Sequence, residues 1–458
     1  MFQRVDNTTC KASDFSTITD KCENHVFSRK DMRQTLATEF DLVCGDEWKL
    51  PLSQSVFFAG VLVGAAVFGH LGDVWGRKNM FLVGLLETTV CGVGAALSTN
   101  FVMFTVFQFF TAMGQVGVFQ TVYVLGIEIV GQSRRVFCGI VIEYFFVVGE
   151  ILLALFAWYF KDWRKIQFTC ILPGLVFFSY YFLLPQSIRW LILKGKYSKA
   201  RIELEKIAKG NKVALPSDQE LQLKFKKVDM NLVSNNANES LLDLVKNPKM
   251  LARLLNVFLN WTVITMIYYG LSMNAASLAG DIFVNFALLS LTEIPGYTLS
   301  WLGMTYLGRR ITLASSLLIG GFSCLISSLL PESYTTGTTV FFLLGKFGAT
   351  AAFGTTYLYT SELFPTRVRN ACVGLSSMMG RVGAIVSPYV ARLGILTGIA
   401  WLPMAVFAAA GLVSGSLTLL LPETKGKNLP RTIAEAEKLG DSSAPAGGYQ
   451  EIGSEEED

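Results

Sequence analysis

The sequence predicts an all-α membrane protein built from two helical bundles. Three observations lead to this fold class: few charged residues, eleven long apolar stretches, and an internal repeat that relates the two halves of the chain. Charged residues make up 16% of the 458 residues and hydrophobic residues 52%, whereas a soluble protein usually carries about 25% charged residues. The net charge of +4 is too small to indicate a nucleic-acid partner, so lipid is the partner that the composition favours.

Long apolar stretches recur along the chain from residue 52 onward. A helix of about 20 apolar residues crosses a bilayer core, and it satisfies its own backbone hydrogen bonds there. We expect eleven spans, at 52–71, 80–99, 102–130, 137–159, 167–185, 251–273, 281–304, 311–331, 338–360, 371–396 and 401–421.

These spans divide the chain into five regions. We expect an extracellular segment at 1–50, a first bundle of five spans at 51–185, a polar linker at 186–250, a second bundle of six spans at 251–421 and a tail at 422–458. The linker is rich in Lys and Glu and is expected to form short amphipathic helices between the bundles.

Basic residues concentrate in the loops on one side of the expected membrane. The basic loops carry Arg77, Lys78, Arg134, Arg135, Arg309, Arg310, Arg367 and Arg369, whereas the opposite loops carry little beyond Lys161, Arg164 and Lys165. Because basic loops stay in the cytoplasm, we expect residues 1–50 outside the plasma membrane and the C-terminal tail inside. The sequon at Asn7 then becomes an extracellular glycosylation site.

An internal repeat relates the two halves of the chain. Three features of the first half recur in the second: Gly76 as Gly308, 232 residues later; Glu128 as Glu362, 234 later; and Gln186 as Glu423, 237 later. The second copy has six spans and the first has five, so we expect a counterpart of span 251–273 to precede Met1 and the chain to be N-terminally truncated. Repeats of this kind place a substrate site between the halves, near the middle of the membrane.

Cysteine and histidine usage gives little sign of catalytic or metal chemistry. Cys10, Cys22 and Cys44 lie in the expected extracellular segment, where disulfides can form, but their number is odd. The chain has two histidines, lacks the paired cysteines of a zinc site, and lacks both a full Walker A pattern and a G-x-G-x-x-G motif. We therefore expect no metal, no cofactor and no enzyme activity.

Several motifs resemble those of one transporter family. The stretch GHLGDVWGRK at 69–78 looks like the signature loop of the major facilitator superfamily. PQSIRWL at 185–191, GDIFVN at 280–285, GKFG at 345–348, YTSELFPT at 359–366 and RVGAIVSPY at 381–389 resemble the organic cation/carnitine transporter family, solute carrier family 22. The resemblance runs from residue 44 to about 431 and is strongest to the carnitine/organic cation branch. It implies a two-bundle major facilitator fold and transport by alternating access.

The same motifs define an expected gate network on the cytoplasmic face, whose role is to hold neighbouring helix ends together rather than to bind substrate. It comprises Gly72, Asp73, Gly76, Arg77, Lys78, Glu128, Arg135, Arg189, Glu362, Arg369 and Glu423. One position departs from the family pattern: Gln186 replaces the usual Glu and removes an acid from the first-half network.

Arg381 is the first candidate for substrate binding. It lies about ten residues into its expected span and so near the middle of the membrane. Ionisable residues at that depth are costly and are functional candidates by default. In the family, cation-selective members usually carry an acid at this position, and the carnitine and anion branches carry Arg. We expect Arg381 to hold a substrate carboxylate; a structural salt bridge with a glutamate of another helix is the alternative.

Two acids share another span. Glu143 and Glu150 are seven residues apart and therefore lie on one helical face. They indicate a preference for cations or zwitterions, although one of them could instead neutralise Arg381, carry a proton or be structural.

The remaining candidates match cavity residues of the family. Trp261 and Tyr268, also seven apart, and the adjacent Tyr269 offer aromatic faces to an ammonium group, with helix packing as the alternative. Glu293 and Lys346 are expected to form a gate or a charge pair in the cavity, again with packing as the alternative. Gln115 and Gln120 are expected to be polar contacts of the substrate.

The favoured function is transport of small organic cations or zwitterions such as carnitine by a monomeric plasma-membrane protein. Organic anion exchange and a non-transporting truncated isoform are the alternatives. The coupling ion, sodium or a proton, stays open; the asparagine–tyrosine pair that accompanies sodium use in the carnitine branch is replaced by Val118 and Phe119, which argues against sodium.

Overall fold

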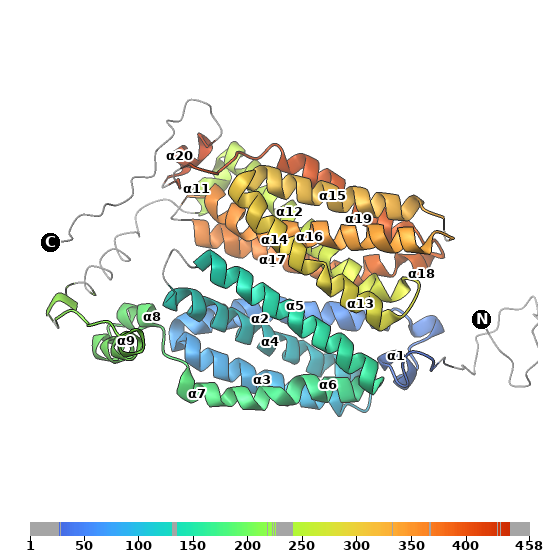
Figure 1. Cartoon of the computed structure of the whole chain (residues 1–458), viewed down its shortest axis with the longest axis horizontal. Coiled ribbons are helices and arrows are strands. Elements are labelled where there is room, and N and C mark those ends of the chain that lie inside the picture. Colours follow the sequence, from blue (N-terminus) through green and yellow to red (C-terminus); the bar gives the residue numbers. More distant parts are fainter. Residues whose placement is uncertain are drawn as a thin grey trace, which may run out of the picture.

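A computed structural model describes residues 27, 29–130, 135–217, 219–221, 223, 225, 241–331, 333–365, 368–427, 429–430 and 432–439. The helices form two bundles that lie side by side, one from α2 (Lys49–Trp75) to α7 (Tyr180–Leu183) and the other from α12 (Pro248–Asn274) to α19 (Leu402–Thr418) (Figure 1). The all-α fold class expected from the sequence is confirmed.

The first bundle contains the five crossings expected for it. After α2 come α3 (Arg77–Ala96), α4 (Phe101–Ile129) and α5 (Arg135–Phe160), and the fifth crossing consists of α6 (Trp163–Ile171), the 3₁₀ segment η4 (Leu172–Ser179) and α7. Side chains mark helix starts here: Asn100 accepts a hydrogen bond from the backbone of Met103 at the start of α4, at 2.8 Å.

The second bundle contains six helical segments among the described residues. They are α12, the broken pair α13 (Ile282–Leu291) and α14 (Glu293–Tyr306), α15 (Arg309–Leu329), α16 (Thr335–Leu363), α17 (Arg369–Ala391) with the short α18 (Leu393–Thr397), and α19.

The break between α13 and α14 has a local cause. Pro295 has no backbone N–H and its ring excludes a regular helical contact with the carbonyl of Leu291, four residues earlier. Helix α13 ends at Leu291 and α14 begins at Glu293. The span expected at 281–304 is therefore two helices, and the break places Glu293 at a helix start inside the bundle.

Eight helices of the described residues are long and apolar enough to cross a membrane, with α13 and α14 taken as one and the fifth crossing taken as Trp163–Leu183. Among them are α2, α5 and α12. Helices α16, α17 and α19 occupy the last three expected spans.

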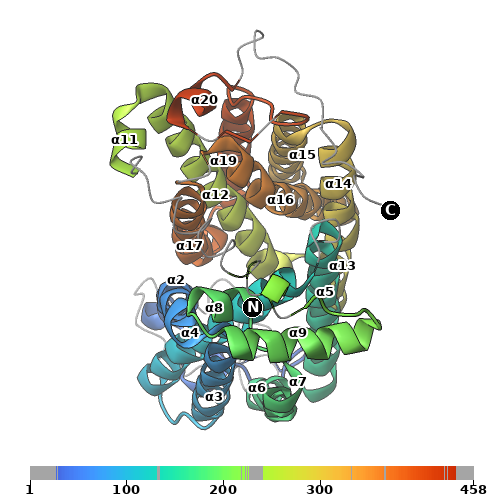
Figure 2. The ribbon, with the colours of Figure 1, turned by 90° about the vertical axis from the view of Figure 1, so that its left-hand side faces the viewer.

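Short helices gather at one end of both bundles. Helices α8 (Ile188–Leu193), α9 (Tyr197–Asn211), α11 (Leu241–Lys246) and α20 (Ile433–Glu437) lie at this end (Figures 1 and 2). Helix α1 (Leu36–Glu39) lies at the opposite end (Figure 1); there Arg164 Nε donates to Glu39 Oε1 at 2.8 Å, and Gln34 and Asp162 form an isolated β-bridge. The chain also contains two short 3₁₀ turns, η2 (Cys44–Asp46) and η5 (Ala275–Ser277).

Glycines set the close approach of several helix pairs. A Cβ at Gly60 of α2 would lie 2.3 Å from the carbonyl oxygen of Phe109 in α4, and a Cβ at Gly383 of α17 would lie 2.1 Å from that of Thr262 in α12. Such contacts drive membrane helix packing, because lipid gives little hydrophobic drive for association.

The two bundles meet along two helix seams. Helix α2 packs on α17, and α5 packs on α13 and α14. Ser55 Oγ donates to the carbonyl of Ile385 at 2.6 Å across the first seam, and the hydroxyls of Tyr144 and Thr298 lie 2.8 Å apart across the second. Several of the candidate substrate residues, among them Glu150 and Glu293, lie close to these seams.

Some predicted features lie outside the described residues. These are the sequon at Asn7, Cys10 and Cys22, and the side chains of Cys44 and Arg135.

Candidate functional site

A buried ion pair lies inside the second bundle. Lys346 Nζ of α16 is 2.8 Å from Glu293 Oε1, and the two side chains are 1% and 0% exposed. Tyr268 of α12 donates its hydroxyl to the same carboxylate oxygen at 2.7 Å. Removal of either charged partner would leave an unpaired charge in an apolar interior, which is strongly unfavourable.

Lys346 is fully engaged by its neighbours. Besides Glu293, its ammonium donates to Ser272 Oγ at 2.7 Å and lies 3.2 Å from the centroid of the Tyr268 ring, an arrangement that adds cation–π attraction. The structure thus brings together Glu293, Lys346 and Tyr268, three of the residues expected to bind substrate, as one packed charge cluster.

Two further carboxyls approach this cluster from the first bundle. Glu150 of α5 is within side-chain hydrogen-bonding range of Glu293 and Ser290. Glu143, two helical turns earlier, is within the same range of Tyr297 in α14. Their seven-residue spacing does place both acids toward one neighbour, the α13–α14 pair. The seam therefore holds three carboxyls and one lysine.

Arg381 occupies a different part of the interface. It lies inside α17, where its Nη1 donates to Ser377 Oγ at 3.2 Å, and its guanidinium lies within electrostatic range of Tyr357 of α16 and Tyr269 of α12. Within the described part of the chain, no carboxylate pairs with it. The salt bridge with a glutamate that the sequence left as the alternative is therefore not formed by the described residues.

Two tyrosines near Arg381, Tyr269 and Tyr357, have further aromatic neighbours. The Tyr269 ring lies 4.7 Å, centroid to centroid, from Phe58 of α2. Trp261 is fully buried; its Nε1 donates to Thr360 Oγ1 at 3.0 Å and its ring meets Tyr357 edge-on at 4.4 Å. Trp261 therefore packs behind Tyr357.

The sequence reasoning missed Tyr357, Tyr297 and Phe58. Tyr357 carried a usable signal, because it lies eleven residues, about three helical turns, after Lys346 and so on the same side of α16. Phe58 and Tyr297 carried none, since their roles depend on how the bundles pack.

The two glutamines lie apart from these groups. Gln115 is exposed on α4, and Gln120 packs on Gly69 of α2, where its amide nitrogen would be 3.2 Å from an added Cβ. Neither hydrogen-bonds the charged residues of the seams in the described part of the chain.

The second-half gate residues form a connected network within their own bundle. Arg309 Nε lies 3.0 Å from Glu362 Oε2, and Thr424 Oγ1 donates to that oxygen at 2.6 Å. Glu423 accepts hydrogen bonds from the backbone N–H groups of Arg309 and Arg310, at 2.8 and 3.1 Å. A carboxylate at the start of α15 is favourable, because the first N–H groups of a helix lack partners.

The first-half network repeats this arrangement with one polar group unsatisfied. Ser187 Oγ donates to Glu128 Oε2 at 2.6 Å, as Thr424 does to Glu362. Gln186 Oε1 would lie 3.4 Å from a Cβ added at Gly76, yet this buried oxygen has no hydrogen-bond partner. Gly76 has φ +93° and Gly308 +98°, so both turns need glycine.

The other gate residues make mostly local contacts. Arg77 pairs with Asp73 at 2.5 Å and its Nη1 would lie 2.8 Å from a Cβ at Gly72. Lys78 lies 5.1 Å from the Tyr181 ring centroid. Arg189 is exposed, and Arg369 Nε donates to the carbonyl of Phe364 at 3.4 Å.

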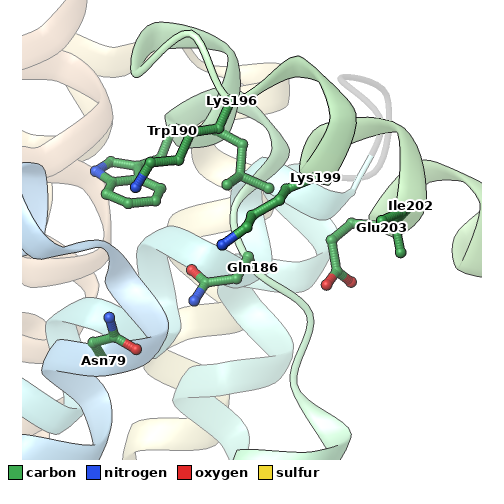
Figure 3. Close-up of a pocket in the computed structure, with 8 residues that line it drawn as sticks. Asn79, Gln186, Trp190, Lys196, Lys199, Ile202 and Glu203 are labelled. Carbon is green, nitrogen blue, oxygen red and sulfur yellow. The ribbon is translucent and has the colours of Figure 1, made fainter.

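A surface pocket of about 280 Å³ adjoins the first-half network. Its polar lining comes from Asn79, Gln186, Lys196, Lys199 and Glu203. In Figure 3 the side chains of Lys199 and Gln186 point toward one another. The pocket lies between α3, α8 and α9.

Comparison with known proteins gives consistent matches over nearly the whole chain. Residues 11–433 match the family described as Sugar (and other) transporter. The chain is 36% identical over 447 residues to the organic cation transporter protein of Drosophila melanogaster, covering 96% of this chain and 81% of that protein. It is 38% identical over 410 residues to organic cation/carnitine transporter 2 of Homo sapiens, covering 89% and 72%, and 37% identical over 412 residues to solute carrier family 22 member 3 of Rattus norvegicus, covering 89% and 73%.

Solved structures share the fold. A partially occluded inward-open structure of the xylose transporter XylE from E. coli aligns with a TM-score of 0.66 at 16% identity, over 84% of this chain and 90% of that one. An inward-open structure of the same transporter aligns with a TM-score of 0.66 over 89% and 93%. At this identity the likeness concerns the arrangement of the helices alone.

Proposed function

Because this chain belongs to the sugar and other transporter family, and within it to the organic cation/carnitine transporters of solute carrier family 22, we propose that it carries small organic cations or zwitterions, carnitine-like in character, across the plasma membrane. It is a multi-pass membrane transporter of the major facilitator superfamily and not an enzyme. Its two bundles work by alternating access.

The observation that carries the substrate class is Arg381. Its guanidinium lies in the membrane interior with tyrosine and serine neighbours and no carboxylate partner among the described residues. The Arg381 side chain is partly buried, and a cation that is partly removed from water without a counter-ion loses part of its solvation free energy. A substrate carboxylate is the group that would compensate it, because a guanidinium forks onto two carboxylate oxygens.

Glu143 of α5 supplies the opposite pole. Glu143 lies near Tyr297 of α14 across the seam between the bundles, and the rings of Tyr269 and Tyr357 lie near Arg381. A substrate with a carboxylate and a quaternary ammonium group would place the first on Arg381 and the second near Glu143 and these rings, which attract cations. This pairing favours zwitterions and cations over simple anions.

Organic anion exchange is the second candidate. Arg381 favours it, because a single carboxylate would satisfy the guanidinium. Glu143 and Glu150 oppose it, because they leave the seam with three carboxyls and a single lysine.

We also propose a membrane orientation, an oligomeric state and a coupling ion for this transporter. We place the end that carries α8, α9, α11 and α20 in the cytoplasm, because the basic turn of Arg77 and Lys78 follows Gly76, which packs on Trp190 of α8. The protein acts as a monomer. Substrate movement is accompanied by a sodium ion or a proton.

Uptake of radiolabelled carnitine, tetraethylammonium and para-aminohippurate tests the substrate class. Cells expressing the chain would be compared with cells expressing Arg381→Ala, at matched surface levels, with and without sodium. Uptake of carnitine that depends on Arg381 supports the proposal. Uptake of the anion para-aminohippurate without uptake of the other two compounds would contradict the proposal and favour organic anion exchange.

A further inference from the structure

One fully buried carboxylate oxygen in the charged seam has no partner. Glu293 Oε1 accepts from both Lys346 and Tyr268, at 2.8 and 2.7 Å. Glu293 Oε2 is shielded from solvent and receives no conventional hydrogen bond. A carboxylate oxygen in such a place normally has a donor, because burying an unsatisfied polar atom costs free energy.

The group that faces this carboxyl is another carboxyl. Glu150 lies within side-chain hydrogen-bonding range of Glu293 and also of Ser290. Two ionised carboxylates have only acceptor atoms and repel one another, so they form a hydrogen bond only when one of them carries a proton. The single ammonium of Lys346 balances one negative charge, and a proton on the pair balances the second.

We propose that Glu150 and Glu293 bind one proton between them and that this proton joins the two bundles at the seam between α5 and the α13–α14 pair. The inference deepens the proposed transport function and rests on it. It makes the protein a proton-linked carrier, with the proton held by one carboxyl from each bundle.

The other charged and titratable groups around the pair come from every helix packed on it. They are Tyr268 and Tyr269 from α12, Glu143 from α5, Tyr297 from α14 and Lys346 from α16. Tyrosine and lysine side chains ordinarily ionise near pH 10, far above the range in which transport is measured. Glu143 lies near Tyr297, whereas Glu150 and Glu293 face one another, so a proton on this pair forms a contact between two carboxyls from different bundles.

In each transport cycle the proton moves from the outside of the membrane to the cytoplasm. Protonation of Glu150 from the outside lets α5 close on α13 and α14. Loss of the same proton to the cytoplasm leaves two carboxylates face to face, and their repulsion favours separation of the helices. One proton thus enters and leaves in each cycle, and external acid promotes uptake.

The first test uses Glu150→Gln, which keeps a hydrogen-bonding side chain but cannot titrate. Uptake would be measured in proteoliposomes at mildly acidic and mildly alkaline external pH, together with substrate exchange at equal pH on both sides. We expect the variant to exchange substrate and to lose the stimulation by external acid. Glu87→Gln, which changes an acid of α3 outside the seam, should keep it. A Glu150→Gln protein with the unaltered pH response would overturn the proposal.

Two further measurements keep the test decisive. If Glu150→Gln does not fold, a lumenal pH dye reports whether the unaltered protein acidifies the vesicle lumen during uptake. Uptake without acidification overturns the proposal.

If the unaltered protein moves no tested substrate, the proposed function fails separately, and labelling with dicyclohexylcarbodiimide still tests the proton site. We expect labelling of Glu150 or Glu293 that declines as pH rises; the absence of labelling at both residues would contradict the site.

Discussion

Lys346 and Glu293 form a 2.8 Å ion pair between α16 and the first residue of α14, and both side chains are hidden from solvent. The pair depends on the helix break at Thr292, which places the carboxylate at a helix start facing Tyr268 and Lys346. It links three helices of the second bundle at the point where Glu150 of the first bundle approaches. Stability and bundle contact are therefore coupled at this position.

Lys346→Met should destabilise the protein by about 3–5 kcal/mol, because it leaves Glu293 buried without its counter-ion. Thermal unfolding of the purified protein in detergent measures the effect. Lys249→Ala removes the exposed contact with Glu437 and serves as the control, with a much smaller expected change, because surface ion pairs contribute little to stability. Equal unfolding temperatures for both variants would show that the buried ion pair contributes no more to stability than the surface pair.

Arg381→Lys should raise the KM for carnitine by about tenfold while changing tetraethylammonium uptake little, because lysine cannot fork onto a carboxylate. Initial uptake rates over a range of substrate concentrations measure both constants. Arg201→Lys, on the surface helix α9, is the matched control. Unchanged uptake kinetics in Arg381→Lys would show that Arg381 does not bind the substrate carboxylate.

Glu143→Gln should weaken uptake of quaternary ammonium compounds selectively, because the amide keeps the size of the side chain and loses its negative charge. Competition between tetraethylammonium and para-aminohippurate separates binding from folding. An equal loss of cation and anion uptake would instead assign Glu143 a role in packing against Tyr297.

Gln186→Glu should stabilise the first bundle by about 1 kcal/mol, because a carboxylate there can accept backbone N–H groups at the start of α3, as Glu423 does at the start of α15. The reciprocal change Glu423→Gln should lower stability. Melting temperatures of the two purified variants give the comparison. A neutral Glu423→Gln would mean that this contact contributes little in either half.

Much of the fold follows from the sequence, because a membrane span needs about 20 apolar residues and leaves a strong local signal. The offset between Gly76 and Gly308 likewise identifies the repeat, and both residues adopt the same positive φ. The break before Glu293 was also readable, since Pro295 follows it closely, but the expected span 281–304 ignored it.

The site was less accessible to sequence reasoning. The spacing of Glu143 and Glu150 predicts their common face, but the approach of Glu150 to Glu293 depends on packing between bundles, which no local pattern encodes. For Trp261 the sequence left a cation contact and helix packing as alternatives; in the structure its Nε1 donates to Thr360 Oγ1 and its ring packs on Tyr357.

Uptake of radiolabelled carnitine and tetraethylammonium by cells expressing this chain, compared with Arg381→Ala at equal surface levels, tests the central claim most directly. The account predicts saturable uptake of both compounds and loss of the carnitine component in the variant. Surface expression without uptake of either compound would contradict it.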